Sequence, residues 1–133
     1  MRMYSVGAPL VPLAVGDEVD RSAWVPHVTI VGNFVVPDDR ADRVVAVFRL
    51  ATAETRPLRF TVGDEAWFGP RGDVLVDRVV SPDVLLLHER VLTALEQDVD
   101  GLRVLDPGHT RSGYHPHRTA PRPRAGVRVP GTC

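Results

Sequence analysis

The tetrapeptide Pro-His-x-Thr occurs twice in this chain, as Pro26-His27-Val28-Thr29 and again as Pro116-His117-Arg118-Thr119. Residues i and i+2 of a β-strand project to the same side, so on a strand each copy presents an imidazole beside a hydroxyl. Two histidines can share acid–base work, one accepting a proton as neutral imidazole and the other donating one as imidazolium. Two hydroxyls can hydrogen-bond phosphoryl oxygens that gain charge in the transition state. This set of groups suits metal-independent chemistry at a phosphodiester.

Both copies lie in segments whose apolar residues alternate with the period of a strand. In "VPHVTIVGNFVV", residues 25–36, the apolar face comprises Val28, Ile30 and Phe34, and the other face comprises His27, Thr29, Val31 and Asn33. In "YHPHRTA", residues 114–120, the two faces comprise His115, His117 and Thr119 on one side and Tyr114, Arg118 and Ala120 on the other. Each motif is therefore predicted to face a groove from one side of its strand.

The rest of the chain predicts the elements that must position these strands. Residues 3–15 form an edge strand that gives way to a loop, because Pro9 and Pro12 remove ladder donors. A helix is expected from Asp38, its N-cap, to a point before Pro57. Its apolar face comprises Ala41, Val44, Val45, Phe48 and Ala51.

Two further strands, over residues 58–69 and 73–80, flank the turn from Gly69 to Gly72 and predict a hairpin. Ser81 and Pro82 open a second helix that runs to about Gln97. Its apolar face comprises Val84, Leu87, Val91 and Leu95. Residues 101–112 are expected to form a loop. The order predicts an α+β protein with antiparallel strands, two covering helices and two related halves around a central groove.

Length, composition and charge indicate the size of the domain, its location in the cell and the charge of its ligand. Its 133 residues, 44% hydrophobic and 25% charged, suit one domain with a substantial core. The chain lacks an apolar run long enough for a membrane span and lacks a signal-peptide pattern at the N-terminus, so we expect a cytoplasmic protein. Residues 111–133 hold five arginines and no acid, which favours an anionic ligand near that end; a disordered Arg/Pro-rich tail over 123–133 explains the same composition.

The paired motifs, together with "EAWFGPRGDVLVDRVV" and "LLLHERVLTAL", resemble the 2H phosphoesterase superfamily, in particular its 2′-5′ RNA ligase and RNA 2′,3′-cyclic phosphodiesterase members. The resemblance covers about residues 24–122. It implies a two-lobed α+β fold with lobes of about 20–80 and 81–122, catalytic His27 and His117 as general acid and base, and phosphate-binding Thr29 and Thr119. It also implies a phosphoric diester hydrolase that acts on RNA 2′,3′-cyclic phosphate ends or on 2′-5′-linked or cyclic nucleotides, with 2′-5′ RNA ligation as the reverse reaction.

Two features depart from that family. Arg118 stands where an apolar residue such as Val28 is expected, and "APRPRAGVRVPGTC" replaces a further strand. The alternative function is therefore a non-catalytic nucleotide- or RNA-binding remnant with an incomplete second lobe. We expect no cofactor, no metal, no protein partner and a monomer.

Other residues with chemical side chains allow more than one interpretation. Tyr114 and Arg122 are candidate substrate contacts, although a tyrosine in a strand also suits a core and Arg122 also suits a solvated tail. A zinc site formed by His109, His115, His117 and Cys133 is disfavoured because their spacing matches no structural zinc pattern. His88, on the second helix beside apolar residues, is expected to be a packing or surface residue rather than a catalyst.

Overall fold

The computed structural model describes residues 1–10, 14, 16–18 and 26–119, and we describe those residues only. The strands are β1 (Arg2–Pro9), β2 (His27–Val36), β3 (Thr61–Phe68), β4 (Val74–Val80), β5 (Arg103–Val104) and β6 (His117–Thr119). They form one antiparallel sheet in the order β1-β2-β6-β4-β3, with β5 also paired to β2. Two helices, α1 (Ala41–Thr52) and α2 (Pro82–Asp98), accompany it. The predicted α+β class, with antiparallel strands and two helices, is confirmed.

β2 carries much of the core of the protein. Its buried side chains are Val28, Ile30, Val31, Phe34 and Val36. Val31 was predicted to face the groove, and that prediction is wrong. The pairing of β2 with β1 shifts register on both sides of the Val6–Val31 pair, and such bulges interrupt the strict alternation of faces. Among the described strands, β1 pairs with β2 alone, so it is an edge strand, as the sequence predicted.

The first helix follows the sequence prediction less closely. A 3₁₀ turn, η2 (Asp38–Arg40), precedes α1, and the N-cap residues are Pro37 for the turn and Arg40 for the helix, not Asp38. The Asp38 carboxylate instead pairs with the N-terminal ammonium at 2.7 Å, which lowers the pKa of that carboxyl. Val45 was expected on the apolar face but is 44% exposed. Val44 and Val47 are the buried residues of α1, so the apolar stripe is narrower than the sequence suggested.

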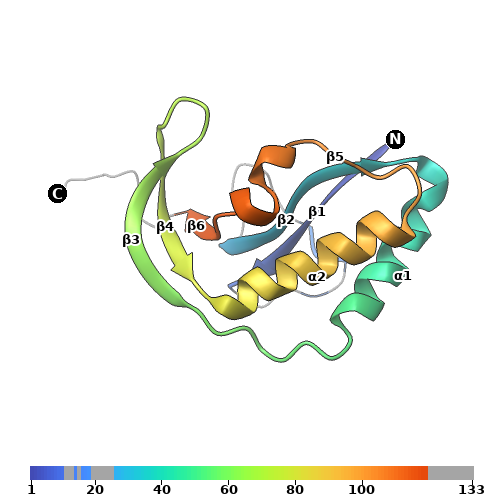
Figure 1. Ribbon diagram of the computed structural model, residues 1–133, viewed down its shortest axis with the longest axis horizontal. Helices are drawn as coiled ribbons and strands as arrows, with labels where there is room; N and C mark the ends of the chain where they lie inside the picture. The colour runs from blue at the N-terminus through green and yellow to red at the C-terminus, as the bar shows by residue number, and fades with distance from the viewer. Residues whose placement is uncertain (11–13, 15, 19–25, 120–133) are drawn as a thin grey trace.

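The second helix begins as predicted. The Ser81 hydroxyl accepts a hydrogen bond from the Val84 N–H at 3.1 Å, and Pro82 occupies the first helical position. The predicted apolar face of α2 is buried, and His88 is buried with it. Figure 1 shows α2 running beside β2, with α1 next to it on the same side of the molecule. In the part of the chain that the structure describes, neither helix is long and apolar enough to cross a membrane.

The predicted hairpin of β3 and β4 is also confirmed. Gly69 and Gly72 adopt positive φ at its turn, and the Gly72 N–H donates to the Gly69 carbonyl at 3.0 Å. The hairpin curves away from the two helices, and β6 joins it to β2 (Figure 1). β4 is therefore a neighbour of the second motif in the sheet, and β3 lies beyond β4. The division into lobes of 20–80 and 81–122 stays a prediction.

Residues 101–112, expected as loop, contain more structure than the sequence indicated. Besides β5, two 3₁₀ turns are present, η3 (Pro107–His109) and η4 (Arg111–Gly113). β6 spans three residues and is shorter than the strand predicted over 114–120. The predicted tail of residues 123–133 lies outside the described residues.

Candidate active site

The two Pro-His-x-Thr motifs lie on neighbouring strands. Val28 of β2 pairs with Arg118 of β6 in an antiparallel ladder. One residue to either side of this pair, His27 therefore lies opposite Thr119, and Thr29 lies opposite His117. Because side chains alternate along each strand, these four residues share one face of the sheet, and Val28 and Arg118 share the other. The fold thus brings together the four residues that the repeated motif singled out.

The antiparallel register also sets how the two histidines lie. His27 faces Thr119 directly, so His27 and His117 form a diagonal pair across the two strands. Diagonal neighbours in an antiparallel sheet are about 7–8 Å apart at the backbone, with side chains within reach of a common partner. Each histidine has the hydroxyl of the other motif opposite it. All four side chains retain solvent access, His27, Thr29 and His117 being partly exposed and Thr119 exposed.

His117 is oriented by two contacts. Its Nδ1 lies 2.9 Å from the His115 carbonyl oxygen, which can only accept, so Nδ1 carries the proton and donates it there. The Phe68 ring of β3 packs edge-on against the imidazole, with centroids 4.6 Å apart. Arg78, opposite His117 on β4, places its guanidinium 5.7 Å from the Phe68 ring centroid and gives this side of the site a cation.

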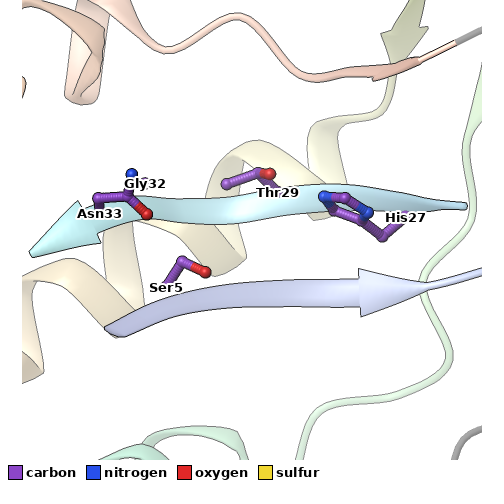
Figure 2. Close-up of a pocket in the computed structure, with 5 residues that line it drawn as sticks. All are labelled: Ser5, His27, Thr29, Gly32 and Asn33. Atoms are coloured by element: carbon purple, nitrogen blue, oxygen red, sulfur yellow. The ribbon is translucent and has the colours of Figure 1, made fainter. Parts of the chain in front are cut away.

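His27 has different surroundings. It lies at the edge of an open hollow of about 300 Å³ above β1 and β2. Figure 2 shows the residues that line this hollow, which are Ser5 on β1 and His27, Thr29, Gly32 and Asn33 on β2. His117 and Thr119 do not line it, so the hollow extends away from the second motif along β2.

Comparison with known proteins agrees with this arrangement. Residues 13–122 match the model of the family described as the 2′-5′ RNA ligase superfamily. The chain belongs to the 2′-5′ RNA ligase superfamily. No curated protein and no solved structure matches the chain.

The unusual arginine of the second motif is accommodated within this superfamily fold. Arg118 lies on the face opposite the histidines, with a partly buried side chain. Its Nε donates to the Asp77 carboxylate at 3.1 Å, and Asp77 is its cross-strand neighbour on β4. Asp77 is only 6% exposed. A charged pair therefore fills a site where the resemblance predicted an apolar residue, and both charges are compensated.

Tyr114, a candidate substrate contact from the sequence, packs against the core of the protein. Its side chain is buried, its hydroxyl donates to the Thr29 carbonyl at 2.6 Å, and its ring stacks on His88 with centroids 3.9 Å apart. Burial raises the pKa of the Tyr114 hydroxyl, which keeps the group protonated as a donor. Tyr114 therefore joins the chain just before β6 to the backbone of the first motif.

His88 is the residue whose importance the sequence did not reveal. It is 1% exposed, and its Nδ1 donates to the Ile30 carbonyl at 2.6 Å while its Nε2 accepts from the Arg111 N–H at 2.9 Å. These two partners require a neutral imidazole with the proton on Nδ1. The one available signal was a histidine on the apolar face of a predicted helix, which indicates packing but not its partners.

The remaining candidate residues lie apart from this site or outside the described residues. Arg122 and Cys133 lie outside the described residues. His109 pairs with Asp106 at 2.9 Å on the exposed η3 turn. Among the residues the structure describes, no group of three or more histidine, cysteine, aspartate or glutamate side chains gathers in a metal-binding arrangement.

Proposed function

We propose that this chain is a metal-independent phosphodiesterase that acts on RNA 2′,3′-cyclic phosphate ends or on 2′-5′-linked or cyclic nucleotides. The observation that carries the proposal is the antiparallel Val28–Arg118 pair, which puts two histidines and two threonines on one face. Membership of the 2′-5′ RNA ligase superfamily supports an RNA or nucleotide substrate. We place the enzyme in the cytoplasm as a monomer.

The proposed mechanism divides the work between the two motifs. One imidazole takes the proton from the attacking water as the oxygen bonds to phosphorus. The other imidazole, protonated, gives its proton to the oxygen that leaves. Thr29 and Thr119 donate hydrogen bonds to the non-bridging oxygens while phosphorus is five-coordinate. When a 5′-hydroxyl replaces water as the nucleophile and attacks a 2′,3′-cyclic phosphate, the bond from phosphorus to the 3′-oxygen breaks, the 3′-oxygen takes a proton, and a 2′-5′ linkage forms.

His117 is already arranged for such a step. The His115 carbonyl holds its Nδ1 proton, so Nε2 exchanges the proton with the substrate. A carbonyl that accepts from Nδ1 also stabilises the imidazolium that forms when Nε2 is protonated. His117 can therefore serve in either protonation state without turning its ring.

The test is hydrolysis of a nucleoside 2′,3′-cyclic phosphate in the presence of EDTA. We expect wild-type activity to persist, and His27→Ala or His117→Ala to lower kcat by about 10²- to 10⁴-fold, the usual contribution of a general acid or base. His109→Ala is the matched control, because His109 is an exposed histidine on η3 outside the site. Loss of activity on chelation, or full activity in both alanine variants, would refute the proposal.

A second function is favoured by one observation. The hollow beside the first motif is lined by His27 and Thr29 but not by His117 or Thr119. A protein that binds nucleotides or RNA without turning them over needs only such a surface. It would show salt-sensitive binding of RNA without hydrolysis. Turnover that depends on both histidines excludes this alternative.

A further inference from the structure

The hollow continues past the residues that phosphate chemistry needs. Thr29 is the last motif residue on β2, and the hollow extends from it to Gly32 and Asn33. Asn33 lies four residues beyond Thr29, which corresponds to at most about 13 Å along an extended strand. One phosphate bound between the motifs cannot fill that length. Figure 2 shows the Asn33 and Thr29 side chains along β2, with Ser5 on the adjacent β1.

The groups at this end are polar and uncharged. Ser5 offers a hydroxyl, and Asn33 offers an amide that both donates and accepts. Within the described part of the chain, neither side chain has a hydrogen-bond partner. The Asn33 backbone, by contrast, is fixed, because its carbonyl accepts from the Leu105 N–H at 3.0 Å. Neutral donors and acceptors on a rigid strand suit sugar hydroxyls or the edge of a base better than they suit an anion.

Gly32 leaves space open within the hollow. A Cβ at this position would meet no atom within 4 Å, and its φ is not among the positive values that only glycine tolerates well. The absence of a side chain here is therefore not required by the backbone or by packing. It leaves the space between the motif and Asn33 open.

We propose that this hollow is a nucleoside subsite, in which Asn33 and Ser5 hydrogen-bond the sugar or base attached to the phosphate held by the first motif. The inference rests on the proposed function for the position of the phosphate. It assigns the nucleoside to the β1–β2 side of the site, away from Phe68 and Arg78. Asn33 is then a specificity-determining residue and Gly32 is the position that keeps the subsite accessible.

The experiment measures binding of adenosine 2′-monophosphate, adenosine 3′-monophosphate and inorganic phosphate by calorimetric titration. Gly32→Leu places an apolar side chain in the hollow, and we expect it to raise the Kd of the two nucleotides about tenfold or more. Asn33→Ala should raise those constants about threefold to tenfold, the range of one hydrogen bond. The Kd of inorganic phosphate should not change in either variant.

Gly108→Leu is the matched control for Gly32→Leu. Gly108 lies on the exposed η3 turn, and a Cβ there would make only an ordinary contact with Asp106 at 3.7 Å. We expect no change in nucleotide binding from it. The subsite is refuted if wild-type protein binds the nucleotides no more tightly than inorganic phosphate, or if Gly32→Leu leaves nucleotide affinity unchanged.

Hydrolysis of a nucleoside 2′,3′-cyclic phosphate by the same variants separates this inference from the proposed function. Nucleotide binding that Gly32→Leu weakens, in a wild-type protein without turnover, would support the subsite and refute the activity. Turnover whose KM is the same in wild type and Gly32→Leu would support the activity and overturn the subsite.

Discussion

The two Pro-His-x-Thr motifs have the same pattern but are held in place by different means. The first begins β2, a ten-residue strand that pairs with β1, β5 and β6 and buries five of its side chains. The second begins and ends β6, a strand of three residues between β2 and β4. Strand pairing and apolar burial suffice to position His27. His117 is too close to the ends of its strand for those forces alone to fix it.

Because β6 is short, additional contacts of Arg118 and of the segment just before β6 hold this strand in place. Arg118 pairs with Asp77, and Tyr114 bonds the backbone of Thr29. The backbone of Arg111 donates to His88, and its guanidinium bonds Glu89 and Glu96 on α2. The comparison shows that one motif depends on the core of the protein, whereas the other depends on a few polar contacts. Changes to those contacts should therefore affect His117 more than His27.

His88→Leu is expected to have the largest effect. It leaves the buried Ile30 carbonyl and the partly buried Arg111 N–H without their partner, and we expect a loss of about 3 kcal/mol in the free energy of unfolding. In the folded variant, β6 should be more mobile than in the wild-type protein. A urea titration measures the stability, and NMR should show the His117 imidazole resonances broadened while those of His27 keep their positions.

Leu86→Ala is the control for His88→Leu. Leu86 lies on the same helix but is 65% exposed, so its truncation should change stability little. Equal broadening of both histidines in the His88 variant would contradict the view that the two motifs are held in place by different contacts.

The Arg118–Asp77 pair should show the next largest effect. Asp77→Ala leaves a partly buried guanidinium without its carboxylate, and we expect a loss of about 2 kcal/mol in stability. The double variant Asp77→Val, Arg118→Val replaces the charged pair with an apolar pair and should recover most of that loss of stability. Denaturant midpoints of Asp77→Val, Arg118→Val and the double variant test this, and strictly additive losses would refute the pairing.

Phe68→Ala tests how His117 is oriented within the second motif. Without the ring at 4.6 Å, the imidazole samples more orientations, and we expect kcat for cyclic phosphate hydrolysis to fall about tenfold. KM should change little, because Phe68 acts through His117 and not on the nucleoside. Phe68→Tyr, which keeps the ring, should retain most of the activity.

Trp67→Ala is the matched control for Phe68→Ala. Trp67 is the adjacent residue of β3, projects to the other face of the sheet and is 64% exposed. It should leave kcat unchanged. A KM effect in Phe68→Ala that exceeds its kcat effect would show that Phe68 contacts the substrate directly.

The same contrast explains which features the sequence could predict. The presence of a strand at β2, the turn glycines and the Ser81 cap depend on neighbours close in sequence, and each was predicted correctly. The burial of Val31 depends on bulges in pairing with β1, and the roles of His88 and Tyr114 depend on residues 58 and 85 positions away. Such contacts leave no local pattern. The repeated motif singled out the four candidate residues, but the adjacency of their strands required the structure.

Tyr114→Phe should give the smallest effect and the finest test of the comparison. It keeps the ring on His88 and removes only the hydroxyl that donates to the Thr29 carbonyl, so we expect a loss of about 1 kcal/mol in stability.

The pH dependence of the stability is the more specific test of the Tyr114 hydroxyl. Burial raises the pKa of Tyr114 in the folded protein, so above about pH 10 the unfolded chain releases a proton that the folded chain keeps. Stability contributed by this group is therefore complete below that pH and declines as the pH rises further. Tyr114→Phe should make the decline shallower, and unfolding midpoints measured between neutral pH and the alkaline range would show it. An equally steep decline in the variant would mean that the Tyr114 hydroxyl does not tie β6 to the first motif.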